Sequence, residues 1–83
     1  MLHIYISTYC GGYSTALRRV EQVRARFPSL AVAVVDVDAP DGDVPRSVIG
    51  TPMYLWDDRV LFWGNPAEAE LLDRIGALHD DQG

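Results

Sequence analysis

The residues with the clearest chemical potential lie in one segment, Tyr9-Cys10-Gly11-Gly12-Tyr13, which holds the only cysteine of the chain. A cysteine thiolate attacks disulfides, and free backbone N–H groups at a helix start favour the thiolate. Gly11 and Gly12 leave such N–H groups unobstructed and let another chain approach closely. The alternative is a small buried apolar side chain, the common state of a free cysteine. We favour a reactive Cys10.

Tyr13 stands three residues after Cys10, where dithiol redox motifs carry their second cysteine. Cys10 can therefore form a mixed disulfide, but an external thiol such as glutathione must resolve it. Tyr13 either donates its hydroxyl to the sulfur or covers it. We expect Tyr9 and Tyr13, which flank the cysteine, to lie on an exposed binding face.

The elements that position Cys10 alternate between strand and helix. A β-branched and aromatic run at 2–7 predicts a first strand, and apolar residues at helical spacing over 13–27 predict a helix that Pro28 ends. Cys10 then lies at the junction between strand and helix. The next run, 30–37, is almost continuously apolar, which is typical of a strand buried on both faces of a parallel sheet.

The second half of the chain predicts a short helix over 43–49 and then two strands, 53–56 and 60–63, that form a hairpin. Asn65 and Pro66 are a favourable cap and first residue for a final helix. The predicted order is β-α-β-(α)-β-β-α. We therefore expect an α/β fold with a four-stranded mixed sheet, a parallel first pair, an antiparallel last pair, and helices on both faces.

Composition limits the partners. With 83 residues, the chain suits one small domain, which we place at 1–79 with a disordered tail at 80–83. With a net charge of −5, we expect the chain to lack the basic surface that binding to nucleic acid or to an anionic membrane requires. A single cysteine fits a reducing compartment, so the predicted location is the cytoplasm. His3 and His79 are far apart in sequence, so we expect no protein-only metal site.

In element order and in three motifs, the sequence resembles the thioredoxin and glutaredoxin superfamily. The segment 9–13 is similar to the family's aromatic-Cys-Gly-Pro-Cys, without the proline and the second cysteine. Ile49-Gly50-Thr51-Pro52 is similar to the family's cis-proline turn, which enters the third strand opposite the active site. Gly64 falls where the family often has a glycine between the last strand and the last helix.

The resemblance implies a cis Thr51–Pro52 bond and a binding role for Thr51, whose backbone would pair with an extended substrate segment. An ordinary turn is the alternative. The chain also departs from the family. Ile4 stands where many thioredoxins place a buried acid, the chain has no lysine, and the glycine pair with which many glutaredoxins hold glutathione is not evident.

Two functions follow from these features. The first is a small monothiol redox protein, in which Cys10 exchanges with a protein or glutathione disulfide and needs no cofactor beyond an external thiol. The second is a redox-inactive binding module that uses the groove between the Cys10 loop and Thr51-Pro52. We favour the first, because a chain that only binds need not keep its cysteine. Dithiol reduction by one molecule is excluded by the cysteine count. We expect a monomer or, as the alternative, a dimer linked through Cys10.

Overall fold

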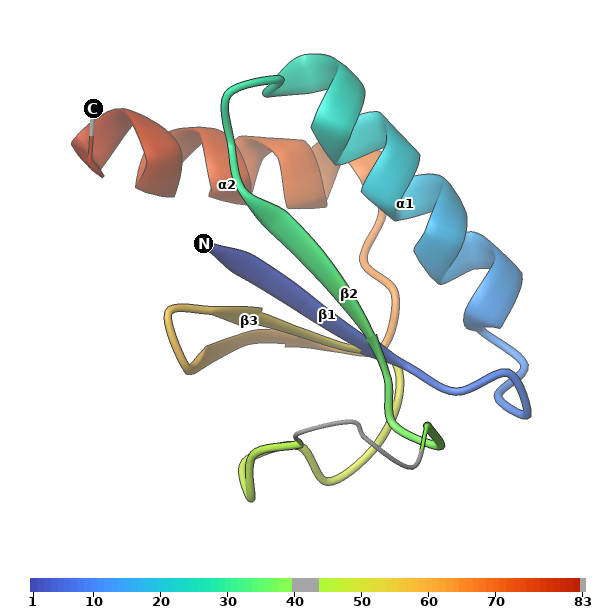
Figure 1. Cartoon of the computed structure of the whole chain (residues 1–83). Coiled ribbons are helices and arrows are strands. Elements are labelled where there is room, and N and C mark those ends of the chain that lie inside the picture. Colours follow the sequence, from blue (N-terminus) through green and yellow to red (C-terminus); the bar gives the residue numbers. More distant parts are fainter. Residues whose placement is uncertain (40–43, 83) are drawn as a thin grey trace.

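The computed structural model describes residues 1–39 and 44–82. Its elements are, in chain order, β1 (Leu2–Ile6), α1 (Tyr13–Arg26), β2 (Val32–Asp36), β3 (Met53–Trp56), β4 (Arg59–Trp63) and α2 (Glu68–Gln82) (Figure 1). The strand order in the sheet is β2-β1-β3-β4. The pair β1–β2 is parallel, and the pairs β1–β3 and β3–β4 are antiparallel. The predicted α/β fold with a four-stranded mixed sheet is confirmed.

The antiparallel hairpin of β3 and β4 depends on two aspartates. Asp57 and Asp58 both have positive φ angles, 47° and 73°. Two successive left-handed residues are typical of a type I′ turn, whose twist matches that of the flanking strands, and aspartate tolerates this conformation better than most residues. At the other end of β4, Gly64 has a φ of 97° and donates its N–H to the Pro52 carbonyl at 2.8 Å. The end of β4 therefore lies beside the turn that enters β3.

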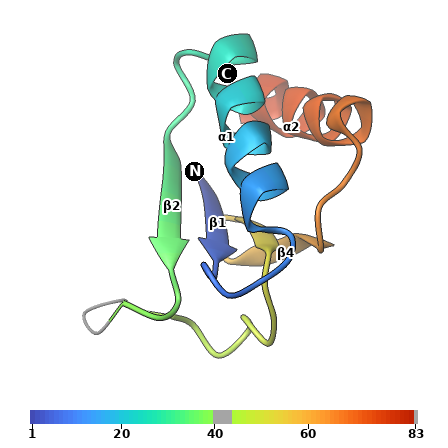
Figure 2. The ribbon, with the colours of Figure 1, turned by 90° about the vertical axis from the view of Figure 1, so that its right-hand side faces the viewer.

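Both helices pack on the same face of the sheet, as Figure 2 shows. Apolar side chains spaced three or four residues apart on each helix meet alternate residues of β1 and β3, because a strand directs every second side chain to one face. The buried residues of this core are Leu2, Ile4, Ile6, Ala16, Val20, Val23, Tyr54, Trp56, Leu71 and Ile75. Burying each larger side chain contributes about 1.5–3 kcal/mol, so this layer is the main source of stability.

The predicted short helix over 43–49 is not formed in its described part, 44–49. The chain makes a single turn there, in which the Val48 N–H donates to the Pro45 carbonyl at 3.0 Å. A helix of so few residues does not offset the cost of its own nucleation. The predicted cap, Asp43, lies outside the described residues.

The second face of the sheet is therefore covered by a loop where we expected a helix. Val44 and Val48, four residues apart on the turn, pack against a smaller core of three buried residues, Tyr5, Met53 and Leu55. In the described part of the chain, the expected arrangement of helices on both faces is replaced by helices on one face and this loop on the other.

Two further features differ from expectation, the burial of β2 and the end of α2. Strand β2 is half-buried along its whole length, whereas we expected burial on both faces. The reason is its position, because β2 is an edge strand and β1 takes the inner place beside it. Helix α2 continues to Gln82, into the segment 80–83 that we expected to be disordered. Neither helix of the described residues is long and apolar enough to cross a membrane.

Candidate functional site

Cys10 lies in the loop between β1 and α1, and its side chain is half-buried. Its backbone N–H donates to the Ser7 carbonyl at 3.0 Å, which folds the loop back on the end of β1. Its sulfur donates a hydrogen bond to the Thr51 carbonyl, with 3.2 Å between Sγ and oxygen. The fold thus brings together the two segments that the sequence singled out, Cys10 and Thr51-Pro52.

The helix start beside Cys10 does not direct its N–H groups at the sulfur. Gly12 is the N-cap of α1, and the Tyr13 N–H donates to the carbonyl of Cys10 itself at 3.2 Å. Across the described ranges, no backbone N–H donates to Sγ, in contrast to our expectation from the glycine pair. The sulfur is the donor in its contact with Thr51, because a carbonyl oxygen can only accept a hydrogen bond.

The Thr51–Pro52 peptide bond is cis, as predicted. Pro52 is buried, and its ring lies against Gly12 at the start of α1. A Cβ atom on Gly12 would lie 3.3 Å from Pro52 Cδ and 2.9 Å from the Asn65 amide nitrogen. Gly12 is therefore needed for the close approach of the Cys10 loop to the proline turn. Gly11 is different, because a Cβ atom there would meet nothing within 4 Å.

Asn65 is the residue whose position the sequence did not predict. We expected it to cap the last helix, but α2 begins at Glu68 and the Asn65 side chain points elsewhere. Its amide nitrogen donates to the Gly12 carbonyl at 2.9 Å, and its amide oxygen accepts from the Tyr54 hydroxyl at 2.7 Å. The one sequence signal for this role of Asn65 was Tyr54, since the hydroxyl of a tyrosine in a buried strand needs a hydrogen-bond partner from another part of the chain.

Tyr54 anchors this contact from the middle of the sheet. Its side chain is fully buried, with 0% of its surface exposed. Burial raises the pKa of Tyr54 to about 12, and the nearby positive charge of Arg19 opposes part of that rise. Tyr54 is therefore a permanent hydrogen-bond donor at neutral pH. Arg19 holds the same loop from the helix side, because its Nε donates to the Pro66 carbonyl at 2.9 Å.

The two tyrosines near Cys10, Tyr9 and Tyr13, lie in different environments. Tyr9 is 90% exposed, as expected, whereas Tyr13 is half-buried and packs on the helix-side core. Tyr13 therefore does not share the exposed face, and its hydroxyl makes no hydrogen bond to the sulfur in the described structure. Two other apolar side chains are exposed near Thr51: Ile49 at 70% and Trp63 at 66%.

Trp63 belongs to the same surface because its indole lies over Gly50, where a Cβ atom would be only 2.6 Å from Trp63 Nε1. Tyr9 directly precedes Cys10, and Ile49 directly precedes Gly50 in the turn that leads to Thr51. We call the three exposed residues Tyr9, Ile49 and Trp63 the apolar flank. Their exposure leaves these apolar side chains accessible to a partner.

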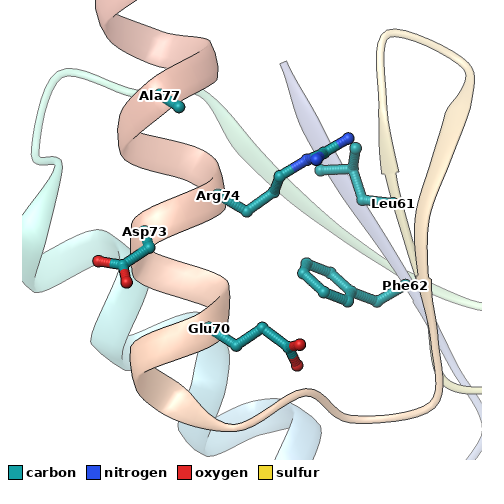
Figure 3. A pocket seen from close by; sticks show the side chains of 6 residues that line it. All are labelled: Leu61, Phe62, Glu70, Asp73, Arg74 and Ala77. Atoms are coloured by element: carbon teal, nitrogen blue, oxygen red, sulfur yellow. The ribbon is translucent and has the colours of Figure 1, made fainter.

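Among the hollows lined by described residues are two that differ in their relation to the site. One, of about 310 Å³, adjoins Thr51 and is lined by Ser7, Val37, Val44, Val48, Ile49, Gly50 and Thr51. The other, of about 480 Å³, lies between β4 and α2 (Figure 3) and is lined by Leu61, Phe62, Glu70, Asp73, Arg74 and Ala77. The first includes a residue of the predicted site, and the second includes none.

No family model, curated protein or solved structure matches this chain. Membership of the thioredoxin and glutaredoxin superfamily therefore stays a prediction. The case for a function depends on the contact between Cys10 and Thr51, on its apolar flank, and on the residues that hold the two loops together.

Proposed function

We propose that this chain is a thioredoxin-like monothiol protein, in which Cys10 exchanges with a disulfide of glutathione or of a protein. The observation that carries the proposal is the 3.2 Å contact between Cys10 Sγ and the Thr51 carbonyl. It places the thiol beside the one backbone group that the resemblance implies for pairing with an extended substrate.

The contact also suggests how the thiol is released. An extended partner that pairs with Thr51 supplies a backbone N–H to the Thr51 carbonyl, which takes the place of the Cys10 S–H. The thiol then loses its proton to water, and the thiolate attacks one sulfur of the partner disulfide. An S–S bond forms between Cys10 and that sulfur, and the other partner sulfur leaves as a thiolate. Exchange is thus coupled to partner binding.

An external thiol completes the reaction, because the chain has no second cysteine. The thiolate of reduced glutathione attacks the partner sulfur of the mixed disulfide and displaces Cys10 as a thiolate, which regains a proton from water. The exposed apolar flank of Tyr9, Ile49 and Trp63 offers apolar contacts to the partner. Such a cycle requires a reducing environment, and we propose the cytoplasm.

The first test is the formation of the mixed disulfide. Reduced chain treated with oxidised glutathione is expected to gain one glutathione on Cys10, seen as an intact-mass increase. Excess reduced glutathione is expected to return the original mass, because it supplies the resolving thiol. Chain whose Cys10 has first been alkylated is the control. Failure of the folded chain to form this adduct would remove the redox proposal.

A redox-inactive binding module is the second candidate. It is favoured by the hydrogen bond from Cys10 to the Thr51 carbonyl, because that bond must break before the sulfur reacts. The exposed apolar flank serves binding as well as exchange. In this reading the hollow beside Thr51 binds a partner, and alkylation or substitution of Cys10 affects binding only through the changed size of that side chain.

A further inference from the structure

The Cys10 loop is held in place by a hydrogen-bonded chain that begins in the core. The Tyr54 hydroxyl donates to the Asn65 side-chain oxygen at 2.7 Å, and the Asn65 nitrogen donates to the Gly12 carbonyl at 2.9 Å. Tyr54 belongs to β3, Asn65 to the connection between β4 and α2, and Gly12 to the start of α1. Three elements that are distant in sequence thus meet two residues from Cys10.

We infer that Asn65 is the positioning residue of the site: it fixes the Gly12 carbonyl, and through it the Cys10 loop, at the distance from Thr51 that the thiol contact requires. The amide suits this role because it accepts on one side and donates on the other, so each neighbour sets its orientation. Tyr54 cannot move away, since its ring is fully buried in the main core. The hydrogen bonds of Asn65 thereby fix the position of the Cys10 loop relative to the buried centre of the sheet.

The start of α1 has no side-chain cap of its own. The N-cap residue of α1 is a glycine, and no side chain caps the helix by a hydrogen bond. The Gly12 carbonyl also accepts from the Ala16 N–H at 2.9 Å, so the Asn65 bond acts at the first turn of α1. Because Asn65 does not touch the sulfur, its effect on Cys10 must pass through the placement of this loop.

The test replaces one atom of the amide. Asn65→Asp keeps the size of the side chain and an oxygen for the Tyr54 hydroxyl, but it places an acceptor where Asn65 donates to Gly12. We expect the Cys10 loop to move away from Thr51. Alkylation of Cys10 by N-ethylmaleimide should then rise toward the rate of the urea-unfolded chain, on the order of tenfold. Exchange with oxidised glutathione should fall by a similar factor.

Arg24→Gln is the control, because it also removes a hydrogen bond from an arginine to a backbone carbonyl, that of Val32, but none of its partners belongs to the Cys10 loop. It is expected to change neither rate. The amide resonances of Cys10 and Gly12 should move in Asn65→Asp and stay in place in Arg24→Gln. If both variants change the two rates together, or neither variant changes them, Asn65 is structural only and the inference is wrong.

Tyr54→Phe provides a second variant, so the inference stays testable even if Asn65→Asp does not fold. It removes only the hydroxyl that orients the amide, and the same opposed changes in the two rates are expected at a smaller size. The inference rests on the proposed function only for the exchange rate. If the natural chain forms no glutathione adduct, the proposed function fails, and the alkylation rates and amide resonances still decide the role of Asn65.

Discussion

Replacing Cys10 by serine is expected to abolish exchange with oxidised glutathione completely while leaving the fold intact. The loss is total because the chain has no other sulfur that can form a disulfide, methionine being unreactive in this exchange. The fold should persist because a serine hydroxyl can donate to the Thr51 carbonyl in place of the thiol. We expect a stability change within about 1 kcal/mol, measured by urea unfolding.

Cys10→Ala is the informative companion to this variant. It also lacks the nucleophile, but it leaves the Thr51 carbonyl without its side-chain donor. If partner binding gates the site as proposed, the free carbonyl should let glutathione peptides bind at least as well to Cys10→Ala as to Cys10→Ser. Residual adduct formation by either variant would show that the exchange does not depend on Cys10. Full retention of partner binding together with an unreactive natural chain would instead support the binding module.

Gly12→Ala is expected to lower the free energy of unfolding by about 1–3 kcal/mol and to reduce exchange with oxidised glutathione. The added methyl group would lie 2.9 Å from the Asn65 nitrogen and 3.3 Å from Pro52 Cδ. The proline is buried and cannot yield, and the amide can yield only by losing its bond to the Gly12 carbonyl. Urea unfolding and the rate of adduct formation measure the two effects.

Gly11→Ala is the control, because its methyl group would meet nothing within 4 Å. Its stability is expected to stay within about 0.5 kcal/mol of the natural chain. If Gly11→Ala and Gly12→Ala lose the same amount of stability and of exchange rate, the loop responds to any added Cβ atom in the same way. The close packing of Gly12 on Pro52 and Asn65 would then not be what sets the position of Cys10.

Much of the fold was predictable because it depends on local periodicity. The alternation of β1, α1 and β2, and the hairpin at Asp57 and Asp58, follow from patterns within a few neighbouring residues. The half-burial of β2 was not predictable from its own apolar run, because its place at the sheet edge depends on the pairing of β1 with β3. The missing helix at 44–49 has the same origin, since Val44 and Val48 pack on residues of other strands.

The site divides in the same way. Cys10 and Thr51-Pro52 could be selected from residue type and spacing, and the fold places them in contact. Asn65 could not, because its partners Tyr54 and Gly12 are distant in sequence, and the residue before a proline looks like an ordinary helix cap. The sulfur's role as a donor was also not predictable, because it depends on which carbonyl the proline turn directs at the thiol.

The most direct test of the account compares Cys10 in the folded chain with the same residue in urea, using oxidised glutathione and N-ethylmaleimide. The unfolded chain corrects for the intrinsic reactivity of the thiol. Oxidised glutathione has a peptide backbone that can pair with Thr51, whereas N-ethylmaleimide has no N–H group. We predict that folding speeds exchange with glutathione on the order of tenfold and slows the reaction with N-ethylmaleimide by a similar factor. A folded chain that reacts more slowly than the unfolded chain with both reagents would contradict the account and identify Cys10 as a protected structural thiol.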